Sequence, residues 1–120
     1  MTAYSTRLKA GLLDNLGKDW LHWMPRWDVQ RRGAWHGQGP VCLMLHHTAA
    51  VGPGVVPFIQ THYDVPAANF SIERNGVVNI HSAHAVWHAG LGSFRGRAPW
   101  SRYGIPDNMA NDWTMGVERA

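Results

Sequence analysis

Cysteine and charged residues are both scarce in this sequence, and each shortage excludes some classes of protein. Cys42 is the single cysteine among 120 residues, which excludes an internal disulfide. It stands in the apolar run 41–45, where we expect a buried, unreactive thiol. Charged residues make up 16% of the chain and hydrophobic residues 45%, a balance that favours a folded domain over a disordered segment. A chain of this length has room for one hydrophobic core.

Long apolar runs are missing as well. No stretch reaches the length of a signal-peptide core or of a membrane-spanning helix. We therefore expect no export signal and no membrane as a partner.

A modest excess of basic residues bears on the choice of partner. Eleven Lys and Arg against eight Asp and Glu give a net charge of +3, which favours polyanions such as nucleic acid or anionic cell-wall polymers. A small metal-dependent nuclease would need basic, phosphate-binding residues beside its histidines. Residues 41–50 and 82–90 hold His46 and His88 and contain no Lys or Arg. The sequence therefore argues against nucleic acid as the partner.

Tryptophan and histidine, in contrast, are abundant. Seven tryptophans in so short a chain either fill the core or line a groove that binds a ligand, and we expect both uses. Among the eight histidines, His46, His84 and His88 stand at predicted strand ends or in loops beside aromatic residues. Neutral imidazole is the commonest ligand of catalytic zinc, which takes three protein ligands and leaves one position for water.

Local patterns predict the elements of the N-terminal third. Leucines at helical spacing indicate a helix over residues 5–16, with Ser5 as its N-cap and Gly17 as its end. A Trp-rich connector interrupted by Gly and Pro follows to residue 40, and we expect irregular chain that wraps the domain.

The remaining chain alternates between strand and helix patterns. We expect a buried strand over residues 41–45, a short helix over 55–63, and a last strand over 113–118. Asn75-Gly76 between two apolar runs predicts a hairpin with a type I′ turn. Residues 87–111 read as a long functional loop. Together these elements predict a single α/β domain with a mixed central β-sheet flanked by helices.

Two residues at predicted strand ends could carry chemistry. His46 follows an apolar strand that would fix its backbone, so it could bind a metal or simply bond to a neighbour. Glu118 ends the last strand, where it could face solvent or serve as a general base if its environment raises its pKa. The local pattern alone leaves both alternatives open for each residue.

Four segments also share their order and approximate spacing with a known family. They are His46-His47-Thr48-Ala49 after the apolar run, the hairpin of residues 69–78, Ala85-Val86-Trp87-His88-Ala89-Gly90, and Asn111-Asp112-Trp113-Thr114-Met115-Gly116-Val117-Glu118. Together they resemble the amidase-2 family, which includes the peptidoglycan recognition proteins and the T7-lysozyme-like amidases of phage endolysins. The resemblance spans roughly residues 41–118. It divides the chain into the helix and connector of residues 1–40 and an amidase-2-like core over residues 41–120.

The resemblance implies a function and a role for individual residues. It implies a peptidoglycan hydrolase, an N-acetylmuramoyl-L-alanine amidase, that uses Zn2+ to activate the water that cleaves the bond between N-acetylmuramic acid and L-alanine. His46 is the implied metal ligand and Glu118 the implied catalytic residue. The implied substrate-binding residues are Trp87, His88, Asn69 and Asn111, with Trp87 and His88 in the groove wall and Asn111 bracing the loop before the last strand.

The sequence departs from the family pattern in its metal ligands. Family members place a second histidine and a Cys or Asp ligand after the segment that ends at Glu118. Three explanations stay open: the chain is a C-terminally truncated piece, which we favour; self-association or a second chain completes the site; or His81, His84 or His88 substitutes. Ala68 stands where T7-like members carry a catalytic tyrosine, so we expect a mechanism that relies on the glutamate.

Two further expectations follow from the resemblance. The alternative to an enzyme is a non-catalytic module that recognises and binds peptidoglycan without cutting it. For an endolysin without an export signal, we expect residence in the host cytoplasm until holins open the membrane, followed by action on the cell wall.

Overall fold

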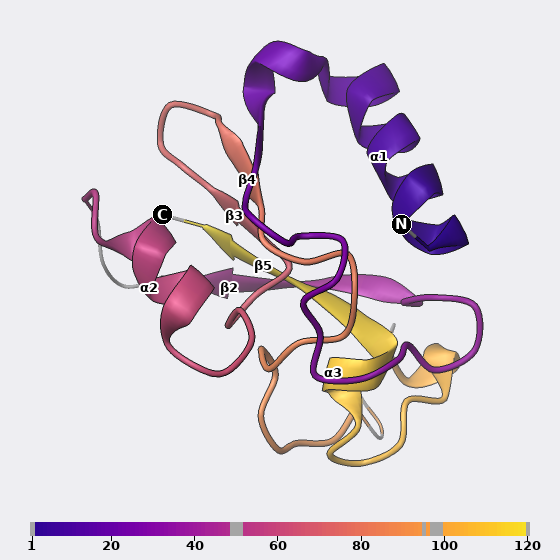
Figure 1. The fold of residues 1–120 in the computed structure, drawn as a ribbon. Helices are drawn as coiled ribbons and strands as arrows, with labels where there is room; N and C mark the ends of the chain where they lie inside the picture. The colour runs from indigo at the N-terminus through magenta and orange to yellow at the C-terminus, as the bar shows by residue number, and fades with distance from the viewer. Residues whose placement is uncertain (1, 49–51, 95, 97–99, 120) are drawn as a thin grey trace.

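Five short strands form one mixed sheet at the centre of the computed structural model, which describes residues 2–48, 52–94, 96 and 100–119 (Figure 1). The strands are β1 (Leu21–Trp23), β2 (Cys42–His47), β3 (Phe70–Ile72), β4 (Val78–Ile80) and β5 (Thr114–Arg119). Their order in the sheet is β1-β4-β3-β5-β2. β3 and β4 pair antiparallel, whereas the other three pairs are parallel. The predicted α/β domain with a mixed sheet is confirmed.

Helices lie on both sides of this sheet. They are α1 (Ala3–Leu16), α2 (Val55–Thr61) and the short α3 (Ala110–Trp113), with 3-10 turns η1 (Lys18–Trp20) and η2 (Trp100–Tyr103). Figure 1 shows α1 and α2 on opposite sides of the sheet. Among the described residues, no helix is long and apolar enough to cross a membrane.

The first helix begins earlier than its sequence pattern predicts. Thr2, not Ser5, is the N-cap, and its hydroxyl accepts a hydrogen bond from the Ser5 amide at 3.1 Å. Ser5 is fully buried in the first turn, where its own hydroxyl donates to the Thr2 carbonyl. The predicted end at Gly17 is confirmed, since this residue has a φ of 80° that favours glycine.

The apolar face of the sheet holds the core. Phe70, Ile80, Met115 and Val117 form its buried centre. Partly buried apolar side chains from α1, β1, the connector and the hairpin surround them: Tyr4, Leu8, Leu12, Leu21, Trp23, Trp27, Trp35, Ile72 and Val78. Three of the seven tryptophans therefore pack against the core, which agrees with one of the two uses that we expected for them.

The connector of residues 17–40 is more regular than we predicted. Its first part forms η1 and then β1, which pairs in parallel with β4, so Leu21 lies opposite Val78 and Trp23 opposite Ile80. Three residues are too few for an alternation pattern to stand out against the surrounding tryptophans. The prediction of purely irregular chain was wrong there, because pairing with β4 decides the conformation.

The predicted strand at residues 41–45 exists as β2, but it is not buried. β2 is an edge strand, and the side chains of Leu43 and Leu45 are 53% and 76% exposed. A continuous apolar run is typical of a strand covered on both faces. Here the run is covered on one face only, and its alternate side chains face outward.

The hairpin is confirmed, but its turn is of another type. A type I′ turn requires positive φ at both central residues. Gly76 has a φ of 90°, but the φ of Asn75 is not positive. Among the described non-glycine residues, only Arg26 and Asn108 have a positive φ. The Gly76 amide instead donates to the Glu73 carbonyl, and the Glu73 amide donates to Val77. The Asn75 side chain accepts from the Val77 amide at 3.0 Å, which stabilises this wider loop.

Candidate functional site

The second face of the sheet is polar, because side chains alternate along each strand. On β5, Met115 and Val117 enter the core, so Gly116 and Glu118 lie on the other face. The parallel register of β2 and β5 places His46 opposite Glu118. The predicted metal ligand and the predicted catalytic residue are therefore neighbours on adjacent strands, which sequence spacing alone could not establish.

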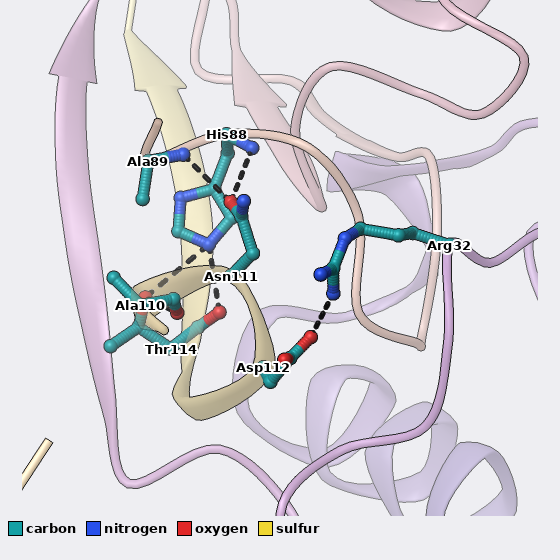
Figure 2. A network of polar contacts seen from close by, with 7 residues as sticks. All are labelled: Arg32, His88, Ala89, Ala110, Asn111, Asp112 and Thr114. Atoms are coloured by element: carbon teal, nitrogen blue, oxygen red, sulfur yellow. Dashed lines mark hydrogen bonds and ion pairs between the residues drawn. The ribbon is translucent and has the colours of Figure 1, made fainter. Parts of the chain in front are cut away.

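His88 lies directly over β5. A Cβ atom on Gly116 would stand 2.4 Å from Cγ of His88, so only glycine leaves room for this ring. Nε2 of His88 is 2.8 Å from the carbonyl oxygen of Thr114, a contact visible in Figure 2. Nδ1 of His88 is 3.2 Å from Nε2 of His46. His88 thus connects His46 to the main chain of β5.

Burial keeps the His88 ring neutral. Loss of solvent lowers its pKa from 6.5 to about 4; the hydrogen bond to the Thr114 carbonyl opposes this shift, and the charge of His46 adds to it. A neutral imidazole has one donor and one acceptor nitrogen, so each of its two contacts has a fixed direction.

Asn111 fixes the segment that carries His88. Its Oδ1 accepts hydrogen bonds from the amides of His88 and Ala89, both at 2.8 Å, as Figure 2 shows. The Asn111 side chain is 5% exposed and stands in α3, immediately before β5. This geometry agrees with the bracing role that the resemblance implies for Asn111.

Arg32, a residue of the connector, holds the ring of Trp87. The guanidinium of Arg32 lies over the Trp87 ring, 4.2 Å from its centroid. The same guanidinium forms an ion pair with Asp112 (Figure 2). Trp87 remains 45% exposed, so its ring is positioned yet accessible. Only the tertiary structure brings residues 32, 87 and 112 together.

Two clefts meet at Glu118. The first has a volume of about 530 Å³ and lies between α2 and the end of β2, with Thr48, Val55, Phe58 and Ile59 among its lining residues. The second has a volume of about 450 Å³, and the residues that line it are Phe58, His62, Tyr63, Ala67, Trp87, His88, Gly90, Asn111 and Glu118. Glu118, Phe58 and Ala67 line both clefts. His46 is half-buried and is not among the lining residues of either cleft; its contact His88 lines the second cleft, and its neighbour His47 lines the first.

The other aromatic rings that line the second cleft with Trp87 were not predicted. The rings of Phe58 and His62 stack with centroids 4.3 Å apart, and Tyr63 packs edge-on against His62. The sequence predicted a long functional loop over residues 87–111. Part of that loop lines a separate cavity, with Phe94, Ser101 and Ile105 among its residues, while Arg95 and residues 97–99 lie outside the described chain.

Asn69 lies inside the domain. Its side chain is fully buried, and its Nδ2 donates to the carbonyls of Ser82 and His84 while its Oδ1 accepts from the Gly116 amide. All three partners are main-chain groups from segments that support the site. Contact with a substrate stays a prediction, and the observed bonds favour a structural role.

A second series of hydrogen bonds crosses the polar face of the sheet, and the sequence did not predict it. Oγ of Ser71 is 2.8 Å from Nε2 of His81, Nδ1 of His81 is 2.7 Å from Oε1 of Gln60, and the Gln60 amide donates to Gln30. Burial, together with the charge of His22, lowers the pKa of His81 to about 4. Ser71 is 3% exposed and His81 fully buried, so this series of bonds fastens α2 to the sheet rather than facing a substrate.

The histidines considered as replacement ligands differ in position. His88 contacts His46, whereas His81 is engaged by Ser71 and Gln60, and Nε2 of His84 donates to the Asp28 carbonyl at 2.7 Å. Within the described ranges, no group of three or more His, Cys, Asp and Glu side chains is gathered closely enough to hold a metal ion.

Comparison of the chain with family models, with curated proteins and with solved structures finds no match.

Proposed function

We propose that this chain carries the active-site face of a zinc-dependent N-acetylmuramoyl-L-alanine amidase that cleaves peptidoglycan. The observation that carries the proposal is the pairing of His46 with Glu118 on adjacent parallel strands, with Glu118 at the junction of two clefts. A carboxylate in a cleft, with a histidine on the adjacent strand, offers a general base and a candidate metal ligand for hydrolysis by an activated water. The resemblance of residues 41–118 to the amidase-2 family supplies the substrate.

The clefts suit a peptide linked to a sugar. The second cleft is lined by the stacked rings of Phe58 and His62 and by the exposed ring of Trp87. Aromatic rings can pack against the apolar faces of sugars, and the Trp87 ring is held in place by Arg32. We therefore assign these rings to the sugar and stem peptide on either side of the scissile amide.

Glu118 acts as the general base and acid in this proposal. Its carboxylate accepts a proton from the attacking water and then passes it to the amine of L-alanine as that group leaves. Zinc, when bound, lowers the pKa of water and polarises the amide carbonyl. His46 supplies one imidazole ligand, and a catalytic zinc takes three protein ligands. The proposal therefore requires further donors, from additional residues, a second copy or a second polypeptide.

Mass spectrometry of purified peptidoglycan after incubation with the chain, with and without added Zn2+, tests the proposal. Once the further donors are supplied, by self-association or by a C-terminally extended chain, we expect zinc-dependent release of intact stem peptides with new L-alanine amino termini. Glu118→Gln should lower the rate by about 10²- to 10⁴-fold, the usual contribution of a positioned general base. Glu73→Gln is the matched control, because Glu73 lies in the hairpin turn and binds the side chain of Asn79.

Two results would contradict the proposal. One is binding of peptidoglycan without any release, even when a C-terminally extended chain is supplied, which would identify a recognition module. The other is release that Glu118→Gln does not reduce, which would place the chemistry elsewhere in the molecule.

A further inference from the structure

A third cleft extends the two that meet at Glu118. It has a volume of about 400 Å³ and lies between the hairpin loop after β3 and the residues around the start of α2. Thr48 and Val55 line both this cleft and the first one. Glu118 and Phe58 in turn line both the first cleft and the second. The three clefts therefore adjoin in series along one groove, with Glu118 between its two ends.

The two ends of this groove differ in charge. The second cleft, which holds the ring of Trp87, has no Lys or Arg among its described lining residues. In the third cleft, Arg74 is the only basic residue among those described, and it is exposed. Glu73 lines the same cleft, but its Oε2 accepts a hydrogen bond from Nδ2 of Asn79 at 3.3 Å.

The guanidinium of Arg74 has no carboxylate partner within the described ranges, where the ion pair is that of Arg32 with Asp112. A guanidinium has a fixed fork of N–H donors that matches the two oxygens of a carboxylate. An unpaired arginine in a cleft therefore favours a ligand that carries a carboxylate at this end of the groove.

The loop that carries Arg74 is held in one conformation. The Gly76 amide donates to the Glu73 carbonyl at 2.9 Å, and the Asn75 side chain accepts from the Val77 amide at 3.0 Å. Behind the loop, a Cβ atom on Gly76 would stand 3.1 Å from the ring of Trp20. Because the main chain is already fixed, binding through Arg74 has to order only a side chain.

The register of the sheet limits the distance between Arg74 and Glu118. Ser71 on β3 lies opposite Glu118 on β5. Arg74 follows Ser71 by three residues, so their Cα atoms are within about 11 Å of each other. The second residue of an extended peptide lies about 7 Å from its start, and the long side chain of arginine spans the remainder. A peptide that begins at Glu118 thus brings its second residue within reach of Arg74.

We propose that Arg74 is a specificity-determining residue that binds a carboxylate on the second residue of the stem peptide. The sugar then lies at the Trp87 end, and the stem passes Phe58 through the first cleft into the third. That the ligand is peptidoglycan rests on the proposed function, whereas the preference for an anion at the third cleft rests on its charge. The proposal also gives the substrate one direction along the groove.

Two soluble fragments that differ in a single group test the proposal. N-acetylmuramyl-L-alanyl-D-glutamate has a free α-carboxylate on its second residue, where N-acetylmuramyl-L-alanyl-D-isoglutamine has a neutral amide. Isothermal titration calorimetry without added Zn2+ measures binding separately from cleavage. We expect the glutamate fragment to bind about five-fold more tightly, the upper range for an exposed ion pair, and this preference should shrink as salt is added.

Substitutions assign the preference to one residue. Arg74→Gln should abolish it and leave the affinity for the isoglutamine fragment little changed, while Arg74→Lys should retain part of it because the charge remains. Arg7→Gln is the matched control. Arg7 is also exposed, but it lies in α1, on the opposite side of the sheet from α2 (Figure 1), so this variant removes the same charge away from the groove.

Four results would overturn the inference. They are equal affinity of the unaltered chain for the two fragments, a preference that persists in Arg74→Gln, an equal loss of preference in Arg7→Gln, and no binding of either fragment. The proposed function is decided separately, by release of stem peptides from peptidoglycan. If no release occurs but the preference depends on Arg74, the inference stands for a module that recognises the stem peptide without cutting it.

Discussion

The two faces of the same five-stranded sheet differ in how they are held together. On one face, Phe70, Ile80, Met115 and Val117 pack against α1 and the tryptophans of the connector. On the other face, buried polar side chains bond to one another and to the main chain in two separate groups, around His88 and around His81. Burial of apolar area has no preferred direction, whereas each hydrogen bond fixes a donor and an acceptor. The first face therefore supplies stability, and the second fixes positions.

Truncation of the core should have the largest effect. Phe70 is 7% exposed at the centre of the apolar face, so Phe70→Ala should lower the free energy of unfolding by about 4 kcal/mol. Leu45→Ala, on the exposed side of the edge strand β2, should change it by less than about 0.5 kcal/mol. Urea unfolding followed by tryptophan fluorescence measures both. Similar losses for the two variants would mean that β2 is covered in solution.

Acid should weaken the polar face next. Because the pKa of His81 in the folded protein is lowered from 6.5 to about 4, its neutral ring stabilises the fold fully above pH 6.5, and this contribution is lost as the pH falls toward 4. The loss should amount to at most about 3 kcal/mol. Unfolding free energies measured between pH 7 and pH 4 test this, and His81→Gln should flatten the dependence. An unchanged slope in that variant would assign the acid sensitivity to other groups.

Filling the space beneath His88 should have an intermediate effect. Gly116→Ala places a methyl group against a ring held on two sides, and we expect a loss of about 2 kcal/mol in the free energy of unfolding. Adding His88→Ala should recover part of that loss if the ring causes it. Gly11→Ala in the middle of α1, where a Cβ meets no other atom within 4 Å, should instead stabilise by up to about 1 kcal/mol.

Removal of the brace should have the smallest effect on stability. Asn111→Ala leaves the amides of His88 and Ala89 without their acceptor, at an expected loss of about 1 to 2 kcal/mol. Asn111→Asp keeps an acceptor in place and should lose less. The chemical shifts of the His46 ring give a second reading, since movement of the loop would change its contact with His88. If Asn111→Ala alters neither stability nor those shifts, Asn111 is not needed to hold the loop.

Local patterns predicted the elements better than they predicted the burial of those elements. The helix end at Gly17, the hairpin around Gly76 and the last strand were all recognisable, because each depends on a few adjacent residues. The prediction that β2 is buried was wrong, because an apolar run does not reveal whether a second layer of structure covers the strand. The three-residue strand β1 was missed for a related reason, since its conformation depends on pairing with β4.

For the candidate site, the sequence predicted most of the residues but not the contacts between them. His46, Glu118, Trp87, His88 and Asn111 were all singled out from their motifs. The register that sets His46 beside Glu118, and the cleft that Glu118 shares with Phe58, were not visible in the sequence. Arg32 carried no signal, because its partners Trp87 and Asp112 are more than 50 residues away along the chain. His62 stacks on Phe58 one helical turn earlier, but nothing in the local sequence shows that these rings line a cleft.

By itself, the sequence determined most of the strands and helices and which side chains could carry the chemistry of the proposed site. Those properties depend on residue type and on spacing along the chain, which the sequence contains in full. Only the tertiary structure decided that His88 stands between the main chain of β5 and His46, and hence which atoms of the two rings face each other. The direction of a hydrogen bond depends on which atoms face each other in space, and residues 46, 88 and 114 meet only when the sheet is complete.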